Sequence, residues 1–241
     1  MPKKAILLIL FTLLFTISAT CSMDYEEMKT LNLAASGIDQ LSADVGAGFL
    51  KIRGIEGLDR IEVEAEFIVK KISDAKARDF IRDKLVFSLE KKGSRAVLTA
   101  KQKSHSGIFN NTNYVINLTV KVPQGINLKI DDGSGFMTVD DIGGDVWIDD
   151  GSGDLELRSI GGDISIDDGS GSIEASGCGG TVEVDDGSGT IRIRDCEGDI
   201  IVHDGSGSIY ISGIEKDVHI KSDGSGSVNI SDVRGEVYKR K

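Results

Sequence analysis

Proline, cysteine and aromatic residues are scarce in this sequence of 241 residues. There are two Pro and three Cys, and Phe, Trp and Tyr together make up 5% of the chain. A hydrophobic core must therefore be aliphatic, and the length allows one long domain or two small ones. Because prolines are so few, the 30 glycines indicate turns and not disorder.

Positive charge is scarce in the second half of the chain. From Asp131 to Lys241 there are 25 acidic and nine basic side chains, a formal charge of −16, whereas residues 21–130 carry +3. This excess excludes nucleic acid and anionic membranes as favoured partners of the second half and favours cations or basic peptides. The alternative is that a solvated acidic surface only keeps the protein soluble.

Long apolar runs are missing except at the N-terminus. The run Ala5–Ile17 follows Lys3 and Lys4 and precedes three small residues. It is too short to span a bilayer comfortably, and the pattern is typical of a secretory signal peptide over residues 1–20. We therefore expect an exported protein.

Cys21 follows this segment directly and predicts a lipoprotein, anchored in the cell envelope by a diacylglycerol on its sulfur. Ser18 and Thr20 depart from the residues that usually precede such a cysteine. Cleavage by an ordinary signal peptidase, which would leave a periplasmic or secreted protein, stays open. Apart from this anchor we expect no contact with a membrane.

A repeated pentapeptide organises the second half of the chain. Its first glycine recurs with a step of 18 residues four times and 19 once. Two short alternating apolar segments and a Gly turn lie between copies, so each repeat predicts two strands of a stacked coil. The six copies are DDGSG from Asp131, Asp149, Asp167 and Asp185, HDGSG from His203, and SDGSG from Ser222.

Aligning the copies places like residues in columns, for example Met137, Leu155, Ile173, Ile191, Ile209 and Val228. Because side chains of a strand alternate between its faces, the polar residues between the columns must point outward. The pattern predicts an all-β fold, a single-stranded parallel β-helix (β-solenoid) with one narrow core. Coils ~4.8 Å apart would make six of them a rod about 29 Å long, and right-handed winding is the default for parallel crossovers.

The first half of the chain is expected to cap this solenoid. We predict a tether over residues 21–29, a β-rich cap with at least one degenerate coil over residues 30–130, and the repeats over residues 131–241. Within the cap, Ser73 and the apolar spacing after it predict one short helix at about 73–84, which we expect to cover the open first coil. Such a cap keeps the first edge from pairing with other molecules, so we expect a monomer.

These features together are similar to a known family. The signal segment, the early coil Gly48–Glu56, the single helix, the step Val122–Pro123 and the Gly-Ser-Gly-x-Ile-x-Ile coils resemble the bacterial putative-adhesin domain family of single-stranded β-helices, over about residues 30–238. The resemblance implies the fold and an adhesin-like role toward a protein or glycan surface ligand. It implies no catalytic motif, because the family defines none.

The second aspartate of the pentapeptide is present in every copy, and strand alternation turns it inward. A buried carboxylate must be hydrogen-bonded or bound to a cation. The neighbouring Gly-Ser-Gly offers backbone N–H groups for a turn-capping ladder, whereas a line of Ca²⁺ sites would relieve repulsion between stacked carboxylates. The GGxGxDxUx pattern of calcium-binding β-rolls is missing, so we assign no metal and no cofactor. The column comprises Asp132, Asp150, Asp168, Asp186, Asp204 and Asp223.

Catalytic constellations are missing as well. His105, His203 and His219 show no spacing typical of a triad or metal site, and Glu156 and Glu174 are expected to be solvated residues of a flat face. Trp147, Tyr210 and Tyr238 lie on different coils and form no aromatic platform for a sugar. We therefore expect that the protein is not an enzyme.

Cys178 and Cys196 lie one period apart and are expected to stack in a core column. As small hydrophobic side chains they would stay free. A disulfide is conceivable in an exported protein, although stacked Cβ atoms about 4.8 Å apart lie just outside the usual range.

Overall fold

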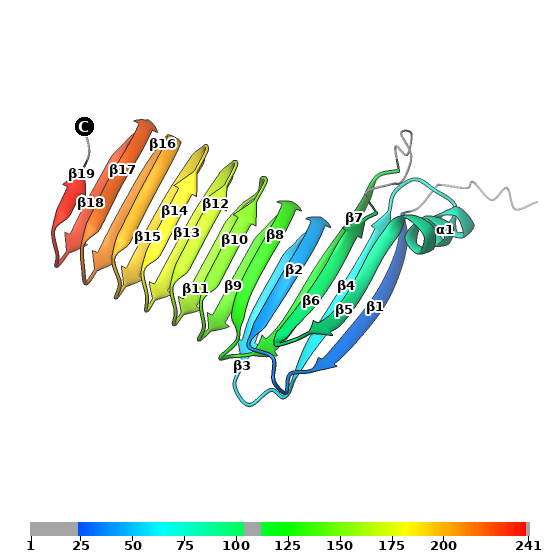
Figure 1. Cartoon of the computed structure of the whole chain (residues 1–241). Coiled ribbons are helices and arrows are strands. Elements are labelled where there is room, and N and C mark those ends of the chain that lie inside the picture. The colour runs from blue at the N-terminus through cyan, green and yellow to red at the C-terminus, as the bar shows by residue number, and fades with distance from the viewer. Residues whose placement is uncertain (1–23, 104–111, 240–241) are drawn as a thin grey trace, which may run out of the picture.

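The computed structural model describes residues 24–103 and 112–239. Its strands form two ladders that face each other across one core, and the coils stack into a rod whose first strands lie beside the helix α1 (Figure 1). The prediction of an all-β solenoid is confirmed.

The ladders, here named sheet A and sheet B, share the long strand β16 (Ile200–Ile214), whose first half lies in sheet B and second half in sheet A. Sheet A contains, in spatial order, β1 (Tyr25–Ala34), β4 (Arg60–Val69), β7 (Tyr114–Pro123), β3 (Leu50–Ile55), β9 (Met137–Ile142), β11 (Leu155–Ile160), β13 (Gly171–Cys178), β15 (Gly189–Cys196), β16 and β18 (Val228–Val233). Sheet B contains β5 (Leu85–Lys92), β6 (Arg95–Gln102), β2 (Gln40–Ala47), β8 (Asn127–Ser134), β10 (Val146–Asp150), β12 (Ile164–Asp168), β14 (Val182–Asp186), β16, β17 (Val218–Ser225) and β19 (Val237–Lys239).

Stacked coils place equivalent residues on one another, as the period predicts. Strands β10 and β12 pair in parallel with Ile148 opposite Ile166, and β11 and β13 pair with Leu155 opposite Ile173. Each of these side chains is at most 3% exposed. One aliphatic core therefore runs through the rod between the two sheets.

The single 19-residue step is absorbed as a bulge. Strand β17 pairs in parallel with β16, and the register shifts between Val202 and His203. One extra residue in β17 takes up the insertion, so that Asp223 still pairs with Asp204.

The coil that comes first in the sequence is not at the end of the rod. Strands β2 and β3 form it, in register with the later repeats, Leu41 opposite Leu128 and Leu50 opposite Met137. Strands β6 and β7, which come later in the chain, cover its other side. The degenerate coil is thus enclosed between strands, and the helix does not cover it as expected.

Antiparallel strands close the N-terminal end of the rod. Strand β1 lies on β4, β4 on β7, and β5 on β6, so β1 and β5 are the outer strands. Strand β1 takes in residues 25–29, which the sequence analysis assigned to the tether. Strand β8 crosses the expected boundary at 130/131 and belongs to the solenoid ladder on both sides of it.

The helix α1 (Asp74–Lys84) connects β4 to β5 across the ends of the cap strands. It buries Ala77, Phe80 and Ile81, and the Phe80 ring lies 5.4 Å from that of Tyr114. Ser73 is its N-cap residue, as predicted, but its side chain makes no capping bond.

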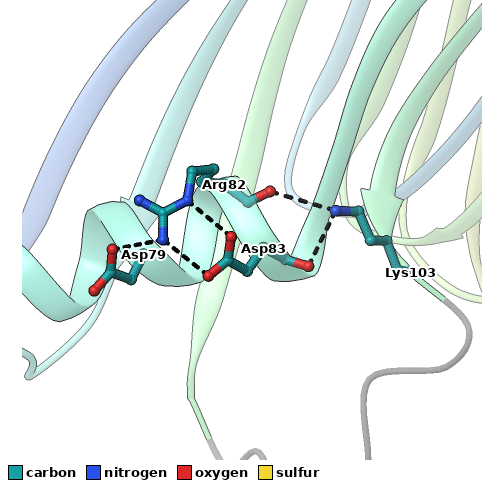
Figure 2. Close-up of polar contacts among 4 residues, drawn as sticks. All are labelled: Asp79, Arg82, Asp83 and Lys103. Carbon is teal, nitrogen blue, oxygen red and sulfur yellow. Dashed lines mark hydrogen bonds and ion pairs between the residues drawn. The ribbon is translucent and has the colours of Figure 1, made fainter.

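The last turn of α1 is held by charged side chains from two directions (Figure 2). Lys103 Nζ donates to the carbonyls of Arg82 and Asp83, at 3.3 and 3.0 Å. Arg82 pairs with Asp79 and Asp83, both at 2.8 Å, and this guanidinium lowers the pKa of the Asp83 carboxyl. A cation on the terminal carbonyls favours the helix end. No helix within residues 24–103 and 112–239 is long and apolar enough to cross a membrane.

Candidate functional site

The Gly-Ser-Gly corner follows each strand of sheet B and leaves no room for a side chain on its second glycine. Gly153 has φ +148°, and a Cβ there would lie 1.7 Å from the carbonyl oxygen of Gly135 in the preceding coil. The same approach repeats at Gly171 and Gly189. Only glycine permits this close stacking, which explains why the residue recurs.

The aspartate before each of these corners points into the rod. Asp132, Asp150, Asp168, Asp186 and Asp204 pair in register from strand to strand and are 1–3% exposed. We call these five the buried aspartate column. Asp223 pairs with Asp204, but its side chain is 29% exposed and contacts Lys239 Nζ at 2.6 Å.

Each central member of the column accepts one hydrogen bond inside its own turn. The N–H groups of Ser152, Ser170 and Ser188 donate to Oδ1 of the aspartate two residues earlier, at 3.3, 3.1 and 2.9 Å. This is the geometry of an Asx turn. The other carboxylate oxygen is buried and has no hydrogen-bond partner among the described residues.

This environment disfavours the ionised carboxylate. Burial raises the pKa of Asp132, Asp150 and Asp186 to about 6, and for Asp150 the charges of its two neighbours in the column add to the effect. Burial also raises the pKa of Asp168 and Asp204. Loss of hydration is the main cause in all five.

A second row of aspartates lies on the outside, one residue before the buried column. Asp131, Asp149, Asp167 and Asp185 are exposed and stacked in register on sheet B. Within the described part of the chain none of these four has an ion-pair partner. We call them the outer aspartate row.

The outer face of sheet A differs, because its acids are neutralised locally. Arg158 pairs with Asp140 and Glu156, and Arg194 pairs with Glu174. The two glutamates considered as catalytic acids thus contact arginines. The uncompensated negative charge of the solenoid is therefore concentrated on the sheet B side.

The opposite corner, after sheet A, carries a third set of aspartates that the sequence analysis missed. Asp145 Oδ1 accepts the N–H of Asp163 in the next coil at 3.0 Å, and Asp163 Oδ1 accepts that of Thr181 at 2.8 Å. Asp199 and Asp217 continue the series. The signal that could have found it is the Asp or Asn recurring with the same period after the Gly turn. These side chains join one coil to the next where the backbone turns away from strand pairing.

A shallow groove of about 330 Å³ runs along this opposite corner, lined by glycines of successive turns and by Cys178. Cys178 and Cys196 are free and buried, as small core residues would be. The Cys196 thiol donates to the carbonyl of Arg194 at 3.3 Å.

The histidines and exposed aromatic residues remain scattered. His219 stacks on Tyr238 at 4.7 Å near the C-terminal end, His203 lies in β16, and His105 lies outside the described residues. Trp147 lies four coils from Tyr238 on sheet B, and Tyr210 lies on sheet A beside Arg192.

No group of three or more His, Cys, Asp or Glu side chains in residues 24–103 and 112–239 is arranged to hold a metal ion. Cys21, the predicted site of lipidation, lies outside the described residues.

No family model and no curated protein matches the chain. Two solved structures resemble it. One is described as a putative cell adhesion protein from Clostridium sporogenes, with 18% identity, a TM-score of 0.40, and coverage of 90% of this chain and 98% of that one. The other is described as a putative lipid binding protein from Parabacteroides distasonis, with 14% identity, a TM-score of 0.38, and coverage of 89% and 97%. The first is of the class that the sequence resemblance named, but at these identities and scores neither says what this chain binds.

Proposed function

We propose that this is a non-catalytic, exported protein of the cell envelope, anchored by lipid at Cys21, whose rigid acidic solenoid serves as an adhesin-like interaction surface. The observation that carries the proposal is the outer aspartate row. Four exposed carboxylates repeat at the ~4.8 Å spacing of the strands and have no ion-pair partner among the described residues. A rigid array of this kind offers the same contact several times over without ordering cost.

Two kinds of partner fit such an array. An adhesive protein or glycan ligand would be recognised by the shape of the flat face as well as its charge. Alternatively, the module senses or sequesters cationic envelope-active peptides or divalent cations, and the concentration of unpaired carboxylates on one side favours this second candidate. Charge-driven capture weakens steeply as salt rises, whereas a contact based on shape does not.

The test is capture from a whole-envelope extract by the mature protein at low and high salt. In one variant, Asp131, Asp149, Asp167 and Asp185 are all changed to Asn. We expect this variant to lose most of the captured partner, because it removes the row and leaves the strands intact.

The matched control removes the same number of charges from exposed positions of the cap, with Glu26, Glu56, Glu64 and Glu90 changed to Gln. It should capture as much as the unchanged protein. Equal loss in both variants would show that net charge and not the outer aspartate row is responsible, and full capture by the row variant would refute the proposal.

A further inference from the structure

The buried aspartate column is a continuous line of carboxyl groups with defined ends. Its members follow one another directly in the strand register from Asp132 to Asp204. At the cap end the next position is occupied by Val45, which is 5% exposed. At the other end stands Asp223, which is partly exposed and paired with Lys239.

The column has more acceptor oxygens than donors. Oδ2 of Asp150, Asp168 and Asp186 and both oxygens of Asp132 and Asp204 are buried without a partner among the described residues. An ionised carboxylate in this situation is costly, since neither water nor a donor compensates its charge. Five such charges ~4.8 Å apart would also repel one another.

No cation on the described elements around the column offsets this cost. The strands across the core, β9, β11, β13 and β15, turn apolar side chains inward. The two nearest ion pairs, Lys101 with Asp44 and Lys239 with Asp223, lie at its ends. The titratable groups beside the column are otherwise the carboxyls of Asp131, Asp149, Asp154, Asp167 and Asp185 and the imidazole of His203.

We propose that the buried aspartate column holds protons between adjacent coils, so that carboxylic acids alternate with carboxylates along the rod and their loss loosens this corner. A protonated Oδ2 is a donor, and the nearest unsatisfied acceptors are the carboxylates one coil above and below. Each shared proton thus supplies a missing donor and removes one charge of the row. The protons are taken from water and returned to it as the pH changes.

The direction of the pH dependence follows from the raised pKa values. In the unfolded chain these groups titrate near the ordinary value of 3.8, and in the folded chain near 6. Between these values the folded protein binds more protons than the unfolded one, so stability falls as the pH rises from about 4 to about 7. Above that range both states are ionised and the loss is complete.

The experiment measures urea unfolding of the mature protein between about pH 5 and pH 8. For one group with these two pKa values, the unfolding equilibrium constant rises about 10-fold over this range. Asp186→Asn keeps the acceptor for Ser188 and the shape of the side chain but cannot titrate. We expect its pH dependence to be weaker than that of the unchanged protein by about this factor.

The matched control is Asp185→Asn, which removes the same charge one residue away, on the exposed outer row. It should retain the full pH dependence. In a carbon-13 carboxyl titration, which does not depend on any variant folding, Asp186 should have a midpoint near 6. Equal pH slopes in the two variants, or a midpoint of Asp186 near the ordinary value, would overturn the proposal. A stability that rises with calcium and falls with chelator would also overturn it, because the column would then hold metal in place of protons.

Discussion

At the scale of single residues, the least expected feature is a left-handed backbone position that recurs in every coil. It directly precedes the third apolar column, at the corner after sheet A. The φ angles range from 52° to 69°. The residues are Asp141, Ser159, Gly177, Asp195, Gly213 and Asp232. Only two of the six are glycine, so the other coils adopt a strained conformation for the sake of the corner.

Replacing a strained residue with glycine should therefore stabilise the rod. For Ser159→Gly, with φ 56°, we expect a gain of about 1 kcal/mol in the free energy of unfolding, since glycine adopts this conformation without steric cost. The control is Ser165→Gly, the same change on an extended strand, which should cost about 1 kcal/mol because it only adds freedom to the unfolded chain. Urea unfolding measures both, and effects of the same sign would show that the backbone position is not strained.

At the scale of the element, each strand separates an inward column from an outward one. Ile191 in β15 is fully buried between Ile173 and Ile209 of the neighbouring coils. The next residue, Arg192, is exposed and lies over the Tyr210 ring at 5.2 Å. Adjacent residues thus experience opposite environments, as period-2 alternation requires.

The two positions should respond very differently to the same acid. Ile191→Asp places an unpaired charge in the core and should cost about 4 kcal/mol or more, enough to fray or unfold the central coils. Arg192→Asp changes a solvated face and should stay within about 1 kcal/mol, including the loss of the contact with Tyr210. Thermal unfolding followed by circular dichroism compares them. Similar losses in the two variants would mean that the inward and outward faces are wrongly assigned.

At the scale of the whole molecule, charge and anchor lie at opposite ends. The acidic repeats form the far part of the rod, whereas β1 begins at Tyr25, beside α1, at the cap end (Figure 1). Cys21 is only four residues earlier in the chain. An anchor there would hold the cap at the membrane and keep the acidic coils, with formal charge −16, free for other partners.

Cys21→Ala tests the anchor directly. If Cys21 is acylated in the cell, the unchanged protein should enter the detergent phase of a phase-partition assay and the variant the aqueous phase. Each buried methylene of the lipid contributes about 0.8 kcal/mol, so the difference should be large. Cys178→Ala is the control, because that thiol is buried and should not affect partitioning. If the unchanged protein is found in the aqueous phase, the anchor does not exist, and the proposed interaction surface can still be tested separately.

The sequence by itself determined the architecture of the rod. Period, strand alternation and corner glycines are local patterns, and stacking identical coils leaves few other ways to bury the aliphatic columns. The same alternation turned the second aspartate of each pentapeptide inward, as at Asp150 and Asp168. It also separated Ile191 from Arg192 before any contact was known.

Tertiary structure alone decided the features that depend on contacts between distant segments. The coil of β2 and β3 lies between strands that follow it in the chain, because its edges pair equally well with either neighbour. The bonds from Asp145 and Asp163 to the next coil, and the unpaired oxygens of the buried column, appear only once the coils are stacked. A period shows which residues meet, but it does not show which of their atoms find a partner. For this protein the difference decides where protons and ligands can bind.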